Sequence, residues 1–129
     1  MEIKSTLTNH AGQTFPVVYR DADSLTELGE KKVSSVHGFC FYKGKMVVVF
    51  SEAKGYWTPP GGGVEEGESV EEAVAREVRE ETNMMVMHQQ FIGYQEVFEP
   101  TLVVTQTRHA CIVEPIGKFE KDPDGDVTE

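Results

Sequence analysis

The order of apolar and polar residues along the chain predicts a β-rich domain. Runs rich in β-branched and aromatic residues predict strands at 14–20, 33–42, 46–51, 84–98 and 101–115. A short turn at Lys43-Gly44-Lys45 joins the second run to the third, and Glu99-Pro100 joins the last two, so we expect antiparallel pairs. The polar stretch 21–32 is predicted to be a connection with one helical turn at 24–28.

One helix is predicted after this first half of the chain. Ser69 and Glu72 form a capping box, the run to Thr82 contains no glycine or proline, and Asn83 suits the left-handed position that ends a helix. At helical spacing one apolar stripe faces the core, and it consists of Val70, Ala73, Val74 and Val78. The preceding stretch, 52–67, holds too many glycines and prolines for a regular element, so we expect a shaped loop. This order of elements indicates an α+β fold with a mixed sheet and the helix on one face.

Length and charge limit the functions to consider. The 129 residues predict a single domain, 1–129, with one core and one concave site. The 22 acidic and 12 basic residues give a formal net charge of −10, which would repel a long nucleic acid. No apolar run is long enough for a membrane span and the first residues lack a signal peptide, so we expect a cytoplasmic protein. Cys40 and Cys111 lie in apolar β-type runs and are expected to be buried, reduced thiols.

Three glutamates lie on or beside the side of the helix that packs inward: Glu77, Glu80 and Glu81. Clustered carboxylates in a partly desolvated groove repel one another unless they are protonated or bridged by cations. Mg²⁺ suits such a cluster because it takes carboxylate, water and phosphate oxygens in octahedral geometry. From these residues alone, the alternative is a solvated charge run in which Arg76 and Arg79 pair with the acids.

The loop and the helix together resemble the Nudix box, G-x5-E-x7-R-E-U-x-E-E-x-G-U, in which U is an apolar residue. Gly62 and Glu68 occupy the first two fixed positions, and Arg76-Glu77-Val78-Arg79-Glu80-Glu81-Thr82-Asn83-Met84 completes the pattern. The preceding Trp57-Thr58-Pro59-Pro60-Gly61 resembles the lead-in to the box in MutT-type Nudix proteins. The one departure is Asn83, where the family has glycine. Because asparagine tolerates the left-handed conformation, we expect a small loss of helix-end stability and no loss of chemistry.

The resemblance implies a Nudix-like α/β/α sandwich with the box helix on one face, and it implies a metal site. Glu77, Glu80 and Glu81 correspond to the family's catalytic positions, which bind Mg²⁺, with Mn²⁺ as an alternative. The backbone carbonyl of Gly61 is expected to be a further metal ligand. In some members of the family the residue at the position of Glu77 serves instead as the general base.

The resemblance also assigns structural roles within the box. Gly62 is a fixed glycine of the loop, and Glu68 and Arg76 are expected to tie the loop to the helix. That pairing makes physical sense because an arginine fork can hold a carboxylate at two points. Arg79 fills a variable position and is expected to face solvent.

The function that the resemblance implies is a Mg²⁺-dependent pyrophosphohydrolase. Its substrate would be a nucleoside diphosphate linked to another moiety, such as a nucleoside triphosphate, ADP-ribose or a related small nucleotide. Metal ions would neutralise charge on the diphosphate while an activated water attacks one phosphorus in line. The alternative is a non-catalytic Nudix-fold module that senses a nucleotide, although such a module would be expected to have lost box glutamates. The box does not determine the substrate, which the family selects with residues outside it.

Features outside the box leave further alternatives open. Tyr56 and Trp57 are either packing anchors or a platform for a base. The stretch 122–126 is predicted to be an acidic turn and not a calcium loop, because its glycine is at the fourth position instead of the sixth. With only the box helix, one face of the sheet would stay exposed. We therefore expect either a homodimer that buries this face or a chain that lacks its C-terminal helix.

Overall fold

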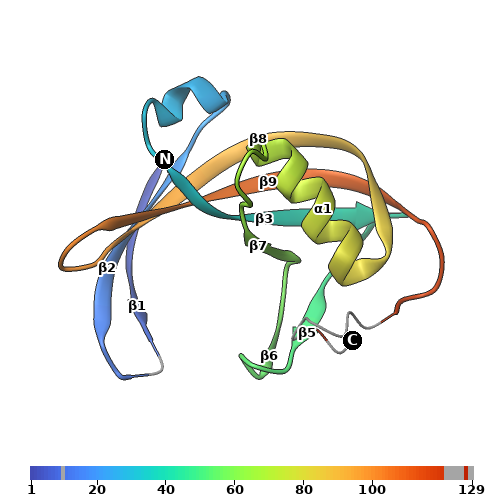
Figure 1. Cartoon of the computed structure of the whole chain (residues 1–129), viewed down its shortest axis with the longest axis horizontal. Coiled ribbons are helices and arrows are strands. Elements are labelled where there is room, and N and C mark those ends of the chain that lie inside the picture. The colour runs from blue at the N-terminus through green and yellow to red at the C-terminus, as the bar shows by residue number, and fades with distance from the viewer. Residues whose placement is uncertain (10, 121–126, 128–129) are drawn as a thin grey trace.

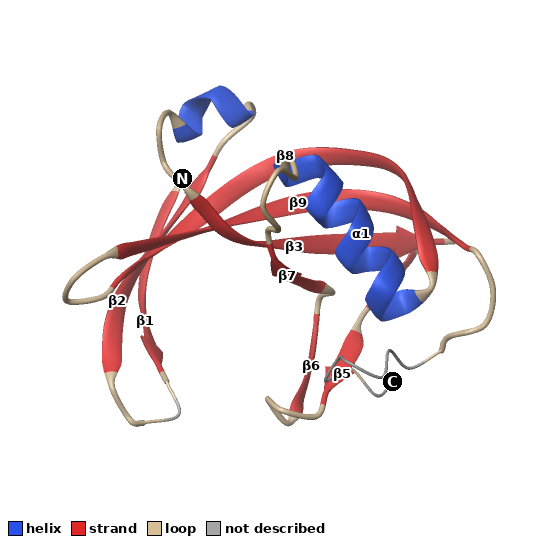
Figure 2. Ribbon diagram, in the orientation of Figure 1, coloured by secondary structure: helices blue, strands red, loops and turns tan. Residues whose placement is uncertain are grey.

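The computed structural model describes residues 1–9, 11–120 and 127. A large sheet, a small two-stranded sheet and a helix make up the regular structure (Figure 2). The elements in chain order are β1 (Glu2–Thr8), β2 (Thr14–Asp21), the 3-10 helix η1 (Leu25–Leu28), β3 (Val33–Tyr42), β4 (Lys45–Val47), β5 (Val49–Ser51), β6 (Tyr56–Thr58), β7 (Gly61–Gly63), α1 (Val70–Thr82), β8 (Met84–Phe98) and β9 (Val103–Pro115).

The large sheet is mixed, as predicted. Its strand order is β1-β2-β8-β9-β3-β4, with β7 paired to β3 beside this path. Strands β3 and β9 are parallel, whereas every other pair in this sheet is antiparallel. The long β8–β9 hairpin curls so that β1 and β2 turn away from the plane of β3, and β5 and β6 form a separate ribbon (Figure 1).

Helix α1 covers one face of this sheet, and its apolar stripe is the one that the sequence predicts. Ala73, Val74 and Val78 are fully buried against side chains from β3 and β9. The core cluster consists of Val36, Cys40, Ala73, Val74, Val78, Cys111 and Val113. Cys40 and Cys111 are buried free thiols that face each other in the β3–β9 register, which confirms the expectation of reduced cysteines. Among the described residues α1 is the one α-helix, and no described helix is long and apolar enough to cross a membrane.

The caps of α1 are also as predicted. The Ser69 Oγ accepts a hydrogen bond from the Glu72 N–H at 3.0 Å, and the Glu72 carboxylate accepts one from the Ser69 N–H at 3.0 Å. Asn83 ends the helix in the left-handed conformation, with φ 54° and ψ 39°. The helix is therefore fixed at both ends by its own sequence. This gives a defined position to the side of the helix that carries Glu77, Glu80 and Glu81, called the acidic edge below.

The structure corrects two expectations about the strands and adds one strand. The predicted run 46–51 divides at Val48, so that β4 pairs with β3 while β5 pairs with β6. The stretch 52–67 is not purely a loop, because β6 and β7 lie within it. Strand β1 is an addition at the edge of the sheet, where its residues are all exposed and give no alternating pattern. The stretch 122–126, predicted to be an acidic turn, lies outside the described residues.

Candidate active site

The guanidinium of Arg76 organises the loop and the helix edge. Its Nε and Nη2 donate to both carboxylate oxygens of Glu68 at 2.7 and 3.0 Å, and Nη2 also donates to the carbonyl of Gly63 at 2.8 Å. Nη1 donates to Glu77 at 2.9 Å and to Glu80 at 3.2 Å. The predicted Glu68–Arg76 pair is thus present as a two-point fork, and it extends to the acids on the next turns.

These contacts shift the pKa values of Glu68 and Arg76 in opposite directions. The hydrogen bond from Arg76, with a further bond from the Glu65 N–H, lowers the pKa of Glu68. The same pairing raises the pKa of the Arg76 guanidinium, mainly through Glu68. The side chains of Arg76 and Glu68 are only 15% and 13% exposed, so both charges depend on each other for solvation. The fork therefore holds as an ion pair at neutral pH.

Glu77 is more enclosed than Glu80. Its side chain is 13% exposed, compared with 39% for Glu80. Its carboxylate packs against Gly62, where an added Cβ would lie 2.6 Å from Oε1. Burial raises the pKa of Glu77; Arg76 opposes this shift, while the neighbouring Glu80 and Glu68 carboxylates add to it. A side chain at position 62 would therefore displace the Glu77 carboxylate, and the raised pKa suits a group that accepts a proton.

Glu81 and Gly61 also lie together. The Gly61 N–H donates to Glu81 Oε1 at 2.8 Å, so strand β7 is fastened to the last turn of α1. Gly61 itself has no room for a side chain, because a Cβ would overlap the carbonyl oxygen of Val36 on β3. The structure thus brings Gly61, which is predicted to offer its carbonyl, next to one of the predicted carboxylate ligands.

The acidic edge fits a hard divalent cation in the type of its donors. Carboxylate and carbonyl oxygens are the ligands that Mg²⁺ and Mn²⁺ prefer. Within residues 1–9, 11–120 and 127, however, no three acidic, histidine or cysteine side chains already converge on one point. Glu77 and Glu80 are instead turned to Arg76, so a bound cation would compete with this guanidinium. Arg79 is exposed, as predicted.

Sequence reasoning missed a cavity on the sheet face opposite α1. Because side chains alternate along a strand, His37 and Phe39 of β3 and Arg108 of β9 point away from the helix. They line a cavity of about 490 Å³. Its other lining residues are Leu7, Lys54, Tyr56, Thr58, Pro59, Gln95 and Gln106. Gln106 and Arg108 alternate with the buried Thr107 and His109, and this alternation was the signal in the sequence.

The cavity adjoins the acidic edge. His37 pairs with Gly61 in the β3–β7 register, and Gly61 is the residue that donates to Glu81. Tyr56 is 56% exposed at the cavity, whereas the ring of Trp57 packs edge-on against Phe50 with centroids 5.4 Å apart. Trp57 is itself 53% exposed, so its packing contact leaves part of the ring accessible, and the platform for a base stays a prediction for both residues.

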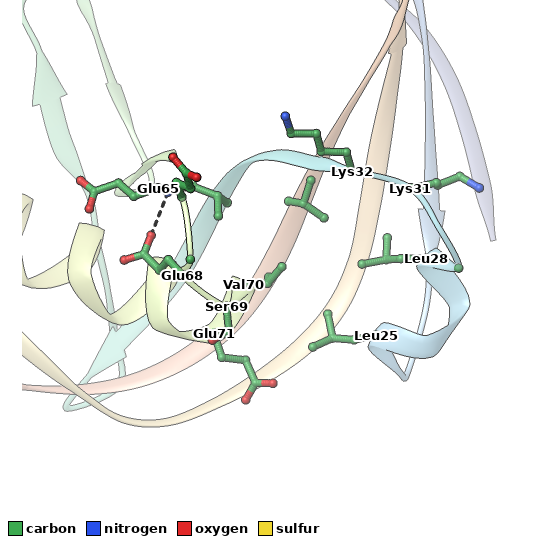
Figure 3. Close-up of a pocket in the computed structure, with 14 residues that line it drawn as sticks. Leu25, Leu28, Lys31, Lys32, Glu65, Glu68, Ser69, Val70 and Glu71 are labelled. Carbon is green, nitrogen blue, oxygen red and sulfur yellow. Dashed lines mark hydrogen bonds between the residues drawn. The ribbon is translucent and has the colours of Figure 1, made fainter.

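A second cavity, of about 730 Å³, lies between η1 and the loop before α1 (Figure 3). Leu25 and Leu28 face the start of α1 across it, and Glu65 and Glu68 from the box loop are joined by a hydrogen bond at its side (Figure 3). None of the three predicted metal-binding glutamates lines this cavity. Glu68 of the Glu68–Arg76 pair lines this cavity, which is separate from the acidic edge.

Comparison with known proteins matches the chain to a family model, that of the NUDIX domain, over residues 31–128. A putative 8-oxo-dGTP diphosphatase of Bacillus subtilis (strain 168), YtkD, is 35% identical over 85 residues, which are 66% of this chain and 51% of that protein. An uncharacterized Nudix hydrolase of the same organism, YvcI, is 41% identical over 49 residues, which are 38% of this chain and 31% of that protein. The matches thus span about half or less of these two relatives.

Among solved structures, the pyrophosphohydrolase BsRppH of Bacillus subtilis aligns with a TM-score of 0.71. The alignment covers 95% of this chain and 73% of that chain at 22% sequence identity. At this identity the similarity establishes the fold, which confirms the predicted Nudix-like architecture.

Proposed function

Because the chain belongs to the Nudix family, we propose that it is a Mg²⁺-dependent pyrophosphohydrolase. The substrate class is a nucleoside diphosphate linked to another moiety. The similarity to a putative 8-oxo-dGTP diphosphatase favours a nucleoside triphosphate, with ADP-ribose and related small nucleotides as the other candidates. We further propose that residues 1–129 act as a single domain.

The observation that carries this proposal is the fork of Arg76 and the acids that it holds. One guanidinium bonds Glu68 in the loop and Glu77 on the helix, while Gly62 lets the Glu77 carboxylate approach the loop backbone. Catalysis by positioned charge needs groups that do not reorganise during the reaction. This linkage of loop and helix supports such a role because it fixes a carboxylate beside a glycine-lined backbone.

We assign the metal to Glu77, Glu80 and Glu81 with the carbonyl of Gly61. Nudix hydrolases generally use divalent metal ions, and a bound Mg²⁺ would supply charge neutralisation to the diphosphate. Mn²⁺ is the alternative ion. Arg76 would hold the Glu77 carboxylate in place, and the alternative role for Glu77 is that of a general base that accepts a proton from the attacking water. The cavity beside Gly61 is the proposed seat for the remainder of the substrate.

The test is a substrate panel with the full chain. Nucleoside triphosphates, ADP-ribose and dinucleoside polyphosphates are incubated with Mg²⁺ or Mn²⁺, and the products are separated by chromatography. We expect Glu77→Gln and Glu81→Gln each to lower kcat by about a hundredfold or more. The matched control is Glu66→Gln, an exposed glutamate of the loop.

Two outcomes would contradict the proposal. If nucleotides bind but no product forms from any substrate with either ion, the non-catalytic sensing module is the correct reading. If either glutamine variant keeps a near-normal kcat with Mg²⁺, the assignment is wrong for that residue. Because burial raises the pKa of Glu77, the ionised carboxylate is less favourable in the folded chain than in the unfolded chain. The Glu77→Gln variant should therefore be at least as stable as the wild type without metal.

We also propose a homodimer that buries the exposed part of the sheet face opposite α1. Phe41 of β3 lies between Ile112 of β9 and Met46 of β4 in the strand registers. These three side chains are 39%, 52% and 43% exposed. A row of apolar residues across neighbouring strands is the kind of patch that a partner normally covers. The other expectation, a C-terminal helix over this face, is not tested by the described residues.

A further inference from the structure

We propose that the cavity opposite α1 binds a second phosphate of the substrate, one carried on the ribose, through Arg108 and Lys54. This inference rests on the proposed function, because it assumes that the diphosphate of the same nucleotide lies at the acidic edge. It narrows the substrate class to nucleotides that carry a phosphate on the ribose in addition to the 5′-diphosphate whose bond is cleaved.

The guanidinium of Arg108 is held rigidly at the floor of the cavity. Its Cζ lies 5.0 Å from the centre of the Tyr19 ring and 5.9 Å from the centre of the Phe39 ring. Its Nη2 donates to Gln95 Oε1 at 2.8 Å. Two aromatic rings and one amide thus fix the plane of the fork, and a fixed fork loses little entropy when it binds a phosphate.

The hydrogen bonds on this floor run in one direction. Arg108 donates to Gln95, and the Gln95 amide donates in turn to Gln106 Oε1. Each glutamine oxygen therefore already accepts one hydrogen bond, and the remaining N–H groups of Arg108 and of the two amides can donate to a ligand. These donors favour a ligand that brings acceptors, which a phosphate does with every oxygen.

The charge of the cavity is opposite to that of the protein. The formal net charge of the chain is −10, yet none of the residues that line this cavity is acidic. In the described part of the chain neither Arg108 nor Lys54 takes part in an ion pair. A half-buried guanidinium without a carboxylate is costly unless a ligand supplies the negative charge.

His37 lines the same cavity as Lys54 and Arg108, and both cations affect its pKa. Burial, together with the nearby positive charges of Lys54 and Arg108, lowers the pKa of His37 to about 4. The imidazole is therefore neutral at pH 7, and the two cations share one cavity with it. A nucleobase would need both donors and acceptors from its site, so two positive charges and a donor array favour an anion.

The geometry also fits one nucleotide that spans both sites. Gly61 separates them, since it pairs with His37 on the cavity side and donates to Glu81 on the helix side. A cavity of about 490 Å³ is larger than a phosphate alone and accommodates part of the sugar as well. The 5′-diphosphate at the acidic edge would then direct a phosphate on the other side of the ribose toward Arg108.

The first experiment is equilibrium binding by calorimetry in the presence of a chelator. The probes are adenosine 3′,5′-bisphosphate and adenosine 5′-monophosphate, and the protein is the full chain. We expect the bisphosphate to bind about tenfold tighter or better, and Arg108→Gln to remove this preference. The Arg79→Gln variant, which loses the same charge from the exposed side of α1, should keep it.

Equal affinities of the wild type for the two probes would overturn the proposal, and so would an unchanged preference in Arg108→Gln. If Arg108→Gln fails to fold, Lys54→Gln takes its place, because Lys54 lies on an exposed loop. This variant should lower the preference severalfold. A preference equal to that of the wild type would refute the proposed phosphate site at Arg108 and Lys54, called the anion seat here.

A second experiment separates this inference from the proposed function. Hydrolysis of adenosine 5′-triphosphate is compared with that of adenosine 3′-phosphate 5′-triphosphate in Mg²⁺. A lower KM for the latter, lost in Arg108→Gln, supports both proposals. Turnover of both compounds with equal KM refutes the anion seat alone. A binding preference without any turnover refutes the pyrophosphohydrolase and leaves the anion seat standing.

Discussion

Replacing Arg76 with alanine removes the one cation that joins the box loop to the acidic edge. The guanidinium bonds Glu68 at two points, Glu77, Glu80 and the Gly63 carbonyl. Alanine leaves three carboxylates near one another without a cation. We expect the variant to lose both folding stability and activity.

The size of the stability loss can be worked from these contacts. Removing one partner of a buried ion pair costs roughly 3–5 kcal/mol, because the other charge is left unpaired. Here Arg76 is 15% exposed and Glu80 is 39% exposed, so water can reach part of the cluster. We therefore place the loss at the lower end, about 3 kcal/mol. With a urea m-value of about 2 kcal/mol per M for a small domain, the unfolding midpoint should fall by about 1.5 M.

The assay is urea unfolding at pH 7 without metal, followed by kcat with Mg²⁺. The matched control is Arg79→Ala, which removes an exposed arginine three residues along the same helix and should cost under about 1 kcal/mol. Arg76→Lys keeps the charge but loses the fork, so it should fall between the wild type and the alanine variant. Equal effects of Arg76→Ala and Arg79→Ala would show that Arg76 is an ordinary surface arginine, and the reasoning would be wrong.

Lowering the pH provides a second check on the same pair. Arg76 lowers the pKa of Glu68 in the folded state below the ordinary value of 4.5. The pair therefore contributes its stability above pH 4.5, and the contribution disappears as the pH falls through the lowered pKa. The difference in unfolding free energy between the wild type and Arg76→Ala should shrink in this range. A difference that stays constant down to pH 2 would exclude the ion pair as its source.

Three further predictions test the site, the core and the assembly. Gly62→Ala should lower kcat by about a hundredfold, because its Cβ would lie 2.6 Å from Glu77 Oε1. The control is Gly63→Ala, whose Cβ meets nothing closer than 3.8 Å. Equal kcat values for the two variants would contradict this prediction. Burial lowers the pKa of His109 to about 4 from the ordinary 6.5, so the unfolded chain binds its proton first as the pH falls. Stability should thus fall from pH 6.5 to 4 by up to about 1.4 kcal/mol per pH unit more in the wild type than in His109→Gln, as urea titrations would show. In sedimentation at micromolar concentration the wild type should be a dimer and Ile112→Lys a monomer; a monomeric wild type would refute the dimer.

Helix α1 was predictable because its signals are local. The capping box of Ser69 and Glu72, the spacing of the valines and the stop at Asn83 all lie within the helix or next to it. The pairing of Glu68 with Arg76 was predictable for a related reason, since the resemblance to the box fixes both positions. What the resemblance could not give is the further reach of the guanidinium to Glu77, which depends on the fold of the loop.

Strand β7 could not be predicted, because its three residues are glycines and carry no strand preference. The strand forms through pairing with β3, a contact that only the folded chain makes. The cavity opposite α1 is another product of long-range pairing. Gln95 and Arg108 come from different strands of one hairpin, and Tyr19 joins them because β2 pairs with β8, where Tyr19 lies opposite Gln95.

Asn83 stands where the box has glycine, and its contacts explain why this departure is tolerated. The residue adopts the left-handed conformation, and its backbone bonds to the Arg79 carbonyl and the Ile116 N–H, both at 2.9 Å, are ones that glycine could also make. Its side-chain amide adds a hydrogen bond to the Lys118 carbonyl at 2.7 Å, which glycine could not make. The small conformational cost of losing glycine is therefore offset by a bond that ties the end of α1 to the segment after β9. Because Glu81 lies in this last turn, the same bond helps to keep the acidic edge in register with Gly61.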